Sequence, residues 1–402
     1  MRVLLVTDSY WPEIRSASKL MVDLAEELKS RGHDVIVMTT WPKYNLDANL
    51  NLSSFKTDEV TSGIRVIRVK SLPLHNSGYL VRGIAQLLLP IIFIYKLITH
   101  EIRVEAAIVY SPPLPLAFVG IWCKKNRAKF ILNLQDLFPQ NAVDLAIMRN
   151  KWLVKFFFLM EKYCYSCADS ITVHSNGNAH NIRRRYPRLI NKIEIIHNWI
   201  EIAHESSQYG YIDYRLKFGI TRKYIAVFAG VIGPSQGLEI ILGVAEALRY
   251  RNDLLFLIVG EGTDKQKLID LKKTMNLDNV QFENFVSSEN YPNLLKICSI
   301  GLVCLSSKNK TPVVPGKILG YMAASLPIAS FLHNESDGHQ IIADAKCGVT
   351  ASSSDVDDCI SKFELLMLKA NEFQLIGKNG FEYASKHFDK RVCIDKIEVL
   401  LE

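Results

Sequence analysis

Several features that would assign a function directly are missing from this sequence. Its eight cysteines are scattered, and the single Cys-x-x-C, at Cys164 and Cys167, has no second pair at the spacing that a zinc site requires. We therefore expect buried, reduced thiols and a cytoplasmic protein. No acidic cluster of the kind that chelates a divalent cation is apparent, so neither a metal nor another cofactor is expected.

The sequence also lacks an uninterrupted hydrophobic run long enough to span a membrane. The longest apolar stretch, residues 83–98, is short for a span and is broken by Gln86, Pro90 and Lys96. A core or interfacial helix fits it better. The apolar start at residues 2–7 is interrupted at once by Asp8, so no secretory signal is expected.

Acidic residues are scarce in the first half of the chain. Residues 1–200 carry 26 Lys and Arg against 16 Asp and Glu, a net charge of +10, whereas residues 201–402 carry 22 against 25, a net charge of −3. The sum is the +7 of the whole chain. A basic first half indicates an anionic partner surface. No nucleic-acid recognition motif accompanies it, so an anionic bilayer is the better candidate.

Apolar, strand-like runs alternate with stretches of helical period along the whole chain. Residues 2–7 and 34–39 are nearly all apolar, and residues 18–31 between them repeat apolar side chains at helical spacing. This order indicates a buried parallel βαβ unit. Further strands are predicted at residues 64–69, 107–110, 130–134, 170–174, 193–197, 224–229, 254–259, 280–283, 300–305 and 328–331, and a closing helix at 381–401.

A chain of 402 residues is too long for one hydrophobic core. Because the pattern loosens from about residue 200 to Tyr214, we place a linker there. We predict an α/β protein with two facing Rossmann-like domains and a cleft between them. The domains comprise residues 1–200 and 201–384, and a helix at about 385–402 crosses back to the first. Ligands in such sheets bind beyond the carboxyl ends of the strands, so the loops there should carry the function.

Two loops of the first domain follow predicted strands and contain candidate residues. Residues 8–18 lead into the first helix, whose main-chain N–H groups suit an anion such as a diphosphate. Arg15 would add a charged donor there, or would be a surface arginine beside an N-cap serine. Asp136 would bind a hydroxyl group or act as a base, or would only cap a helix.

Three loops of the second domain have a composition that suits a phosphate. Glycines let the backbone approach a ligand closely, although turn glycines are the simpler explanation. Lys317 starts a helical pattern after a Pro-Gly turn, where a lysine opposes the helix dipole. This placement is more understandable beside a bound anion, but a solvated lysine is the alternative. The glycines are Gly230, Gly233, Gly237, Gly260 and Gly262.

Together these stretches resemble family-4 retaining glycosyltransferases of the GT-B fold over essentially the whole chain. Within that family the chain is most similar to bacterial O-antigen and capsule enzymes that transfer N-acetyl-L-fucosamine or similar amino sugars. The resemblance rests on the order and spacing of residues 11–14, 134–139, 230–237, 259–262 and 315–324.

The chain departs from the family pattern where the donor binds. The paired glycines, the diphosphate-binding Arg and Lys, and the Glu-x7-Glu pair are missing from their places, and Lys317 is our candidate replacement cation. Arg15 and Ser16 stand in place of the paired glycines. Val231 and Gln236 stand in place of the Arg and Lys, and Pro312 and Gly320 stand in place of the two glutamates. The predicted catalytic residues are Asp136, Glu13 and Lys317. The predicted donor-binding residues are Arg15, Ser16, Gly230, Gly233, Gln236, Gly237, Gly260, Gly262, Val286, Pro315, Gly316 and Lys317.

The resemblance implies transfer of an amino sugar from a UDP-sugar, held mainly by the second domain, to a polyprenyl-diphosphate-linked saccharide. The product would serve O-antigen or surface polysaccharide biosynthesis. Loop N–H groups and Lys317 would stabilise the departing diphosphate without metal, and the donor phosphate would take the acceptor proton. Two alternatives stay open: a UDP-sugar 2-epimerase of the same fold, which fits the missing glutamates, and a non-catalytic binding protein.

Two stretches of the first domain predict peripheral docking on the inner face of the bacterial inner membrane. Residues 149–163 combine four basic side chains with Trp152 and three consecutive phenylalanines, and residues 80–98 form a second apolar stretch flanked by Arg82 and Lys96. Such helices suit an anionic bilayer interface. The alternative is two ordinary core helices. However, three adjacent phenylalanines cannot all share one face of a helix.

Overall fold

The chain divides into two compact units in a computed structural model that describes residues 1–43, 46, 55–72, 79–144, 148–202, 212–287 and 289–402. Unit 1 comprises Met1–Asn198 and Lys390–Glu402, and unit 2 comprises Trp199–Asp389. Most of the predicted linker, residues 203–211, lies outside the described residues. The C-terminal segment therefore belongs with the first part of the chain, and unit 2 is inserted between the two segments of unit 1.

Unit 1 is built on an eight-stranded sheet in the order β3-β4-β2-β1-β5-β6-β7-β8. Neighbouring strands are parallel, apart from the antiparallel pair β3 and β4. The central strands are apolar on both faces because helices cover both sides. The short edge strand β3 was not predicted, since its sequence, Asp-Glu-Val-Thr, is mostly polar. The strands are β1 (Arg2–Val6), β2 (Asp34–Thr40), β3 (Asp58–Thr61), β4 (Ile64–Val69), β5 (Ala106–Ser111), β6 (Lys129–Leu134), β7 (Ser170–Val173) and β8 (Ile193–Ile195).

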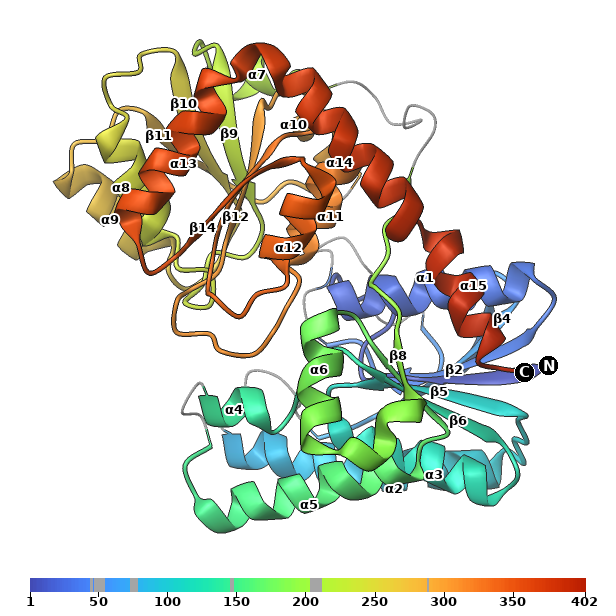
Figure 1. The fold of residues 1–402 in the computed structure, drawn as a ribbon. Helices are drawn as coiled ribbons and strands as arrows, with labels where there is room; N and C mark the ends of the chain where they lie inside the picture. Colours follow the sequence, from blue (N-terminus) through green and yellow to red (C-terminus); the bar gives the residue numbers. More distant parts are fainter. Residues whose placement is uncertain (44–45, 47–54, 73–78, 145–147, 203–211, 288) are drawn as a thin grey trace. The chain divides into compact units, whose positions relative to one another are not determined.

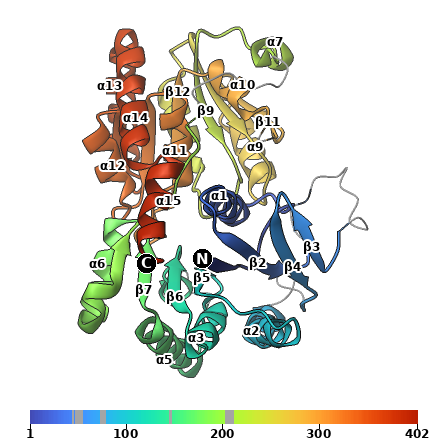
Figure 2. The ribbon, with the colours of Figure 1, turned by 90° about the vertical axis from the view of Figure 1, so that its right-hand side faces the viewer.

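Helices cover both faces of this sheet (Figures 1 and 2). On one face α2, α3 and α5 lie side by side over the main apolar core, and on the other α1 packs with α15. The helices are α1 (Ser16–Ser30), α2 (Tyr79–Thr99), α3 (Ala117–Lys125), α4 (Gln140–Asp144), α5 (Lys151–Cys167), α6 (Asn176–Arg185) and α15 (Lys390–Val399), with 3-10 turns at Leu114–Leu116 and Pro187–Lys192.

The long apolar helix α2 corrects one prediction from the sequence. It continues through Pro90 and contains the only segment of the described chain that is long and apolar enough to cross a membrane, Val81–Thr99, with a mean hydropathy of 1.7. Its length therefore does not exclude a span. One stripe of the helix is fully buried in the core of unit 1, however, as expected for a core helix. That stripe consists of Ala85, Leu89, Phe93 and Leu97.

Unit 2 has a six-stranded, all-parallel sheet in the order β11-β10-β9-β12-β13-β14, between two apolar clusters. The sequence pattern missed β14, because its small and polar residues are only partly buried. The strands are β9 (Tyr224–Ala229), β10 (Leu254–Val259), β11 (Val280–Glu283), β12 (Ile300–Cys304), β13 (Ile328–Leu332) and β14 (Gly348–Ser352). The helices are α7 (Tyr214–Phe218), α8 (Glu239–Ala247), α9 (Lys265–Thr274), α10 (Tyr291–Lys296), α11 (Gly316–Ala323), α12 (Gly338–Ala345), α13 (Val356–Leu368) and α14 (Phe373–His387), with a 3-10 turn at Ala370–Glu372.

The single closing helix predicted at residues 381–401 is in fact two helices. Helix α14 ends at His387 in unit 2, and α15 begins at Lys390 in unit 1. Between them the main-chain oxygen of Phe388 accepts a hydrogen bond from the N–H of Ile200, 2.8 Å away. The apolar period continues across this break, so periodicity alone could not locate it.

Candidate functional site

The two glycine-bearing loops of unit 2 follow the adjacent strands β9 and β10 and lie against each other. The N–H of Gly230 donates to the oxygen of Val259, and the N–H of Ile232 donates to that of Glu261. A Cβ atom on Gly260 would lie 1.9 Å from the oxygen of Gly230. Gly230, Gly260 and Gly262 all adopt positive φ. Gly260 and Gly262 are therefore required by the close approach of the two loops at the carboxyl edge of the sheet, whereas a Cβ atom on Gly230 would meet the side chain of Lys317.

Lys317 lies against the first of these loops. Its ammonium group is 4.6 Å from the centre of the Phe228 ring and 3.0 Å from the side-chain oxygen of Gln236. In the described part of the chain no carboxylate lies within ion-pair distance of it. Burial lowers the pKa of the Lys317 amine to about 8. A partly buried cation that lies against a ring face and an amide oxygen, with no carboxylate nearby among the described residues, is suited to an incoming anion.

The other predicted donor-binding residues of unit 2 lie around Lys317 or in neighbouring loops. Pro315 precedes α11, and Gly316 is its first residue, so the free N–H groups of this helix start beside Lys317. Gly237 is in the left-handed region, and a Cβ there would lie 2.9 Å from the Cα of Ser306. Gly233 shows no such restriction. Val286 follows β11 and packs against an apolar cluster, where it can contribute only contact or main-chain groups.

In unit 1 the loop after β1 brings Glu13 and Arg15 together with Asp8, which is not among the residues predicted from the sequence. Arg15 Nη1 lies 3.8 Å from Asp8 and 3.9 Å from Glu13. Glu13 is held within the unit, because one oxygen accepts from the Ser9 hydroxyl at 2.8 Å and the other from the main chain of Lys43 at 3.0 Å. These bonds show an anchoring role for Glu13. Ser16 is exposed at the start of α1.

Asp136 follows β6, two strands away from β1. Its side chain is exposed, yet the surrounding protein partly excludes water from the carboxyl group, and this desolvation raises its pKa. The helix-cap alternative is wrong, since the next helix, α4, begins only at Gln140. Tyr110, on β5 between these strands, is buried, and burial together with the charges of Asp136 and Asp8 raises the pKa of its hydroxyl. Asp8, Tyr110 and Asp136 thus gather at one edge of the sheet.

A second polar group beyond β7 was not predicted either. His174 is buried, which lowers the pKa of its imidazole to about 4, and it accepts a hydrogen bond from the side-chain amide of Asn178 at 3.3 Å. His197 Nδ1 donates to the main-chain oxygen of His174 at 2.8 Å. The sequence pattern placed both histidines at the ends of predicted strands, 170–174 and 193–197. In the structure β7 ends at Val173 and β8 at Ile195, so both histidines lie in the loops that follow.

No group of three His, Cys, Asp or Glu side chains suited to a metal ion occurs among the residues that the structure describes. The sequence Asp355-Val356-Asp357 does contain two spaced aspartates, but Asp355 caps α13 by accepting from the N–H of Asp358. All eight cysteines are free, and only Cys167 is not fully buried. The expectation of buried thiols is confirmed for the other seven.

Comparisons with known proteins define the class. Residues 17–204 match the family model described as Glycosyltransferase Family 4, and residues 213–383 match the model described as Glycosyl transferases group 1. The chain is a glycosyltransferase of the GT-B fold that contains both of these domains. This confirms the predicted fold class and the predicted class of enzyme.

Three individual proteins illustrate the similarity. WcaI of Escherichia coli (strain K12), named as a colanic acid biosynthesis glycosyl transferase, is 23% identical over 343 residues, which cover 80% of this chain and 81% of that protein. The structure of sucrose-phosphate synthase from Thermosynechococcus elongatus covers 100% of this chain and 98% of its own, with a TM-score of 0.75 and 14% identity. HepE of Anabaena, in complex with UDP, covers 100% and 99%, with a TM-score of 0.70 and 14% identity.

Proposed function

We propose that this glycosyltransferase transfers an amino sugar, with N-acetyl-L-fucosamine as the specific candidate, from a UDP-sugar to a polyprenyl-diphosphate-linked saccharide, with retention of configuration. The product would enter a surface polysaccharide such as O-antigen. The observation that carries the donor assignment is the partly buried ammonium of Lys317 beside the two stacked glycine loops. The UDP bound to HepE and the colanic acid assignment of WcaI support the nucleotide and the type of product.

The chemistry follows from the position of Lys317 at the start of α11. In the transfer, the bond between the sugar C1 and the diphosphate oxygen breaks, and a bond from C1 to the acceptor oxygen forms. Negative charge develops on the diphosphate, and the departing phosphate takes the proton of the acceptor hydroxyl group. A cation and free N–H groups that are already in place stabilise this charge without reorganisation. We therefore propose that no divalent metal is needed.

Two measurements test this proposal. Calorimetry with UDP in the presence of EDTA should show binding, whereas binding that appears only after Mg²⁺ or Mn²⁺ is added would contradict the metal-independent site. A screen of UDP-sugars with a synthetic polyprenyl-diphosphate-GlcNAc acceptor should then give a transferred product. Conversion of the UDP-sugar without acceptor would instead indicate a 2-epimerase, and binding without any conversion would indicate a non-catalytic protein.

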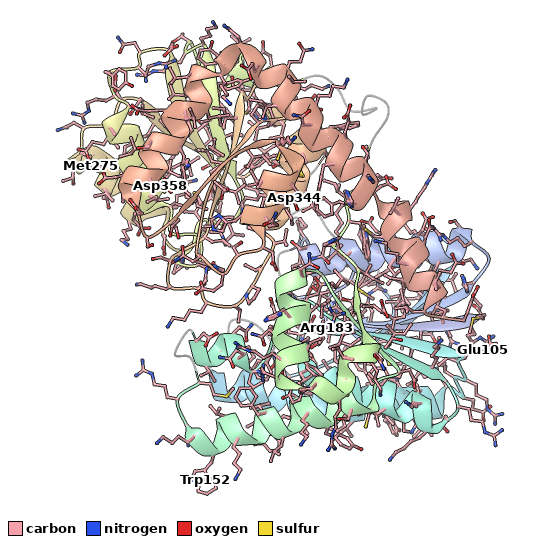
Figure 3. All side chains as sticks on the ribbon, viewed as in Figure 1. Glu105, Trp152, Arg183, Met275, Asp344 and Asp358 are labelled. Carbon is pink, nitrogen blue, oxygen red and sulfur yellow. The ribbon has the colours of Figure 1, made fainter. Side chains whose placement is uncertain are left out.

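We further propose that unit 1 docks on an anionic membrane through α2 and α5. On α2 the face opposite the buried stripe is apolar and exposed, at spacings of three and four residues that keep its side chains in one line. On α5, Trp152 is 80% exposed and points away from the rest of unit 1 in Figure 3. The exposed side chains are Val81, Ile84, Leu88, Ile91, Tyr95 and Ile98 on α2, and Trp152, Leu153, Phe156, Leu159 and Tyr163 on α5.

Basic side chains accompany this apolar surface. Lys151, Lys155 and Lys162 are exposed on α5 itself. Lys155 and Lys162 also line a shallow pocket of about 350 Å³, together with Arg185 from α6. Each basic residue near an anionic leaflet contributes about 1 kcal/mol, so a few such residues support reversible docking. Co-sedimentation with vesicles of increasing phosphatidylglycerol content, at low and high salt, tests this. Binding that ignores both variables would contradict electrostatic docking.

A further inference from the structure

The carboxyl edge of the unit 1 sheet contains a topological switch point. Strand β1 pairs with β2 on one side and with β5 on the other, so the chain winds outward in opposite directions from the β1/β5 pair. Ligands of open α/β sheets bind in the crevice beyond such a pair of strands. In unit 1 this position corresponds to the loop that follows β1 and the end of β5, where Asp8 and Tyr110 lie.

Asp8 differs from its neighbour Glu13 in how its carboxylate is satisfied. Both oxygens of Glu13 accept hydrogen bonds from within the unit. Asp8 is only 7% exposed, its carboxylate accepts a hydrogen bond from its own main chain, and its nearest charged partner is Arg15 at 3.8 Å, which is longer than a hydrogen bond. One main-chain donor leaves most of the acceptor capacity of this carboxylate unused, so a further donor would stabilise it. A sugar hydroxyl group is such a donor.

We propose that the Asp8 carboxylate binds a hydroxyl group of the acceptor saccharide and thereby positions it for transfer. This inference rests on the proposed function, in which unit 2 holds the UDP-sugar and unit 1 is left for the acceptor. Asp136 lies two strands away, about 10 Å at the usual strand spacing, and lines the same edge from the far side of Tyr110. Together the two acids can contact two parts of one saccharide.

The charge state of Asp8 gives this assignment a signature in pH. Burial raises the pKa of its carboxyl to about 6, and nearby Glu13 also raises it, whereas Arg15 lowers it. Tyr110 and Asp136 share this edge, as does His174 further along it, and Tyr110 stays neutral because burial raises the pKa of its hydroxyl. Since only the ionised carboxylate is a full acceptor, binding of the saccharide should weaken as the pH falls through about 6.

The test measures binding of a short-chain polyprenyl-diphosphate-GlcNAc acceptor by calorimetry between pH 5 and 8, alongside binding of UDP. Asp8→Asn should weaken acceptor binding by about tenfold or more, the value of a hydrogen bond to a charged group, and should remove the loss near pH 6. UDP binding and the melting temperature should change little. Asp23→Asn, which alters another buried aspartate of unit 1 on α1, is the matched control and should keep both acceptor binding and its pH profile.

Each outcome has a distinct meaning. If the unaltered protein binds the acceptor and Asp8→Asn binds it equally well with the same pH profile, the role of Asp8 is overturned while the proposed function stands. If the unaltered protein binds UDP but not this acceptor at any pH, the acceptor assignment fails and the Asp8 inference fails with it. If Asp8→Asn unfolds, the pH profile of the unaltered protein decides, because acceptor binding that stays constant through pH 6 contradicts the inference.

Discussion

At the scale of single residues, Lys317 gives the most direct prediction. Replacement of Lys317 by Met should weaken UDP binding at least tenfold, because a charge-assisted contact to phosphate contributes about 1.5–3 kcal/mol. Lys273→Met, which removes an exposed lysine on α9 of the same unit, should leave UDP binding intact. The measurement is calorimetric titration with UDP. An unchanged affinity in the Lys317 variant would mean that this lysine has no contact with the phosphates.

Lys317 also predicts the alkaline limit of UDP binding. The pKa of its amine is lowered to about 8 in the free protein, so the cation that binds phosphate is lost as the pH rises through that value. The affinity for UDP should therefore fall from about pH 7.5 to 9.5, and uptake of a proton should accompany binding at pH 8.5. Titrations in buffers of different ionisation enthalpy measure that uptake. The Lys317→Met variant should show neither effect.

Gly260 allows a test of the stacked loops. An alanine there would place its Cβ 1.9 Å from the main-chain oxygen of Gly230 and would have to adopt φ near +148°. We expect Gly260→Ala to destabilise unit 2 by about 1–3 kcal/mol and to weaken UDP binding by displacing the loops. Gly83→Ala is the control, since no atom lies within 4 Å of its Cβ position on α2. Denaturant unfolding and UDP titration measure both effects, and a Gly260 variant of normal stability would contradict the argument.

Site residues that stand in a local sequence motif were predictable, and those brought together only by the fold were not. The glycines of the β9 and β10 loops and Lys317 stand beside strand-to-helix turns and are recognisable there. Asp8 and Tyr110 belong together only through the β1/β5 pairing, which joins residues about 100 positions apart. Glu13 is predicted as catalytic within the stretch of residues 11–14 that supports the family resemblance, and its two hydrogen bonds to Ser9 and to the main chain of Lys43 are not predictable from spacing.

At the scale of elements, the strands with strong apolar runs were predictable. Strands β4, β9 and β10 lie where the sequence pattern placed them, and so does β11, although only Val280 of its four residues is buried. Strands β3 and β14 are polar or only half-buried, so no apolar run marks them. The three phenylalanines of α5 behave as helical geometry requires, since Phe156 is 47% exposed while Phe157 is buried.

The exposed face of α5 leads to a prediction about membrane docking. Replacing Trp152 and Phe156 together by Ser should reduce co-sedimentation with phosphatidylglycerol vesicles several-fold, because each side chain would otherwise bury apolar area in the interface. The melting temperature should not fall, since neither side chain is part of the core. Leu368→Ser, at an apolar side chain of unit 2 that is 81% exposed, should leave vesicle binding unchanged. Equal binding by the double variant would show that α5 does not enter the interface.

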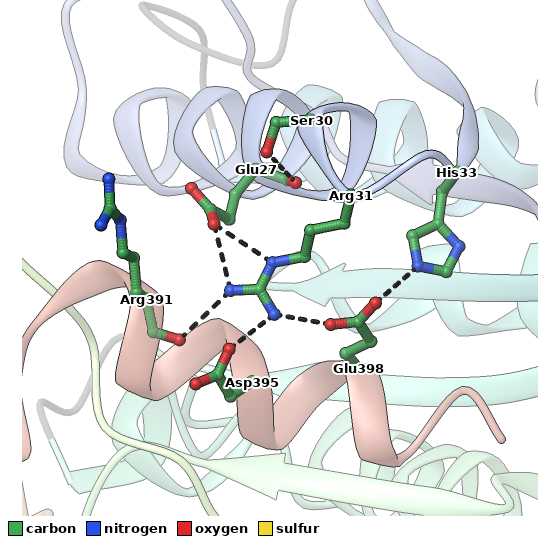
Figure 4. Close-up of polar contacts among 7 residues, drawn as sticks. All are labelled: Glu27, Ser30, Arg31, His33, Arg391, Asp395 and Glu398. Carbon is green, nitrogen blue, oxygen red and sulfur yellow. Dashed lines mark hydrogen bonds and ion pairs between the residues drawn. The ribbon is translucent and has the colours of Figure 1, made fainter.

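At the scale of the whole molecule, the discontinuous unit 1 predicts that the last turns of the chain stabilise its first part. Arg31, at the end of α1, contacts Glu27 on its own helix and Asp395 and Glu398 on α15, and Glu398 also accepts from His33 (Figure 4). Beneath these ion pairs, α15 and the residues after it bury four apolar side chains: Cys393, Ile394, Ile397 and Leu401.

Deletion of residues 390–402 should therefore destabilise unit 1 and spare unit 2. Full burial of a large apolar side chain contributes about 1.5–3 kcal/mol, so the loss of this segment amounts to several kcal/mol and should lower the melting temperature of unit 1 by about 10 °C or more. Arg31→Met, which leaves the apolar contacts in place, should cost only about 1–2 kcal/mol because its ion pairs are partly exposed.

Unit 2 is complete in the truncated chain, since it ends at Asp389. Calorimetric unfolding with and without UDP separates the two units: UDP should still raise the transition of unit 2 in the truncated protein. A truncated chain with an unchanged first transition would show that α15 adds little to unit 1, and loss of UDP binding would show that the two units do not fold independently.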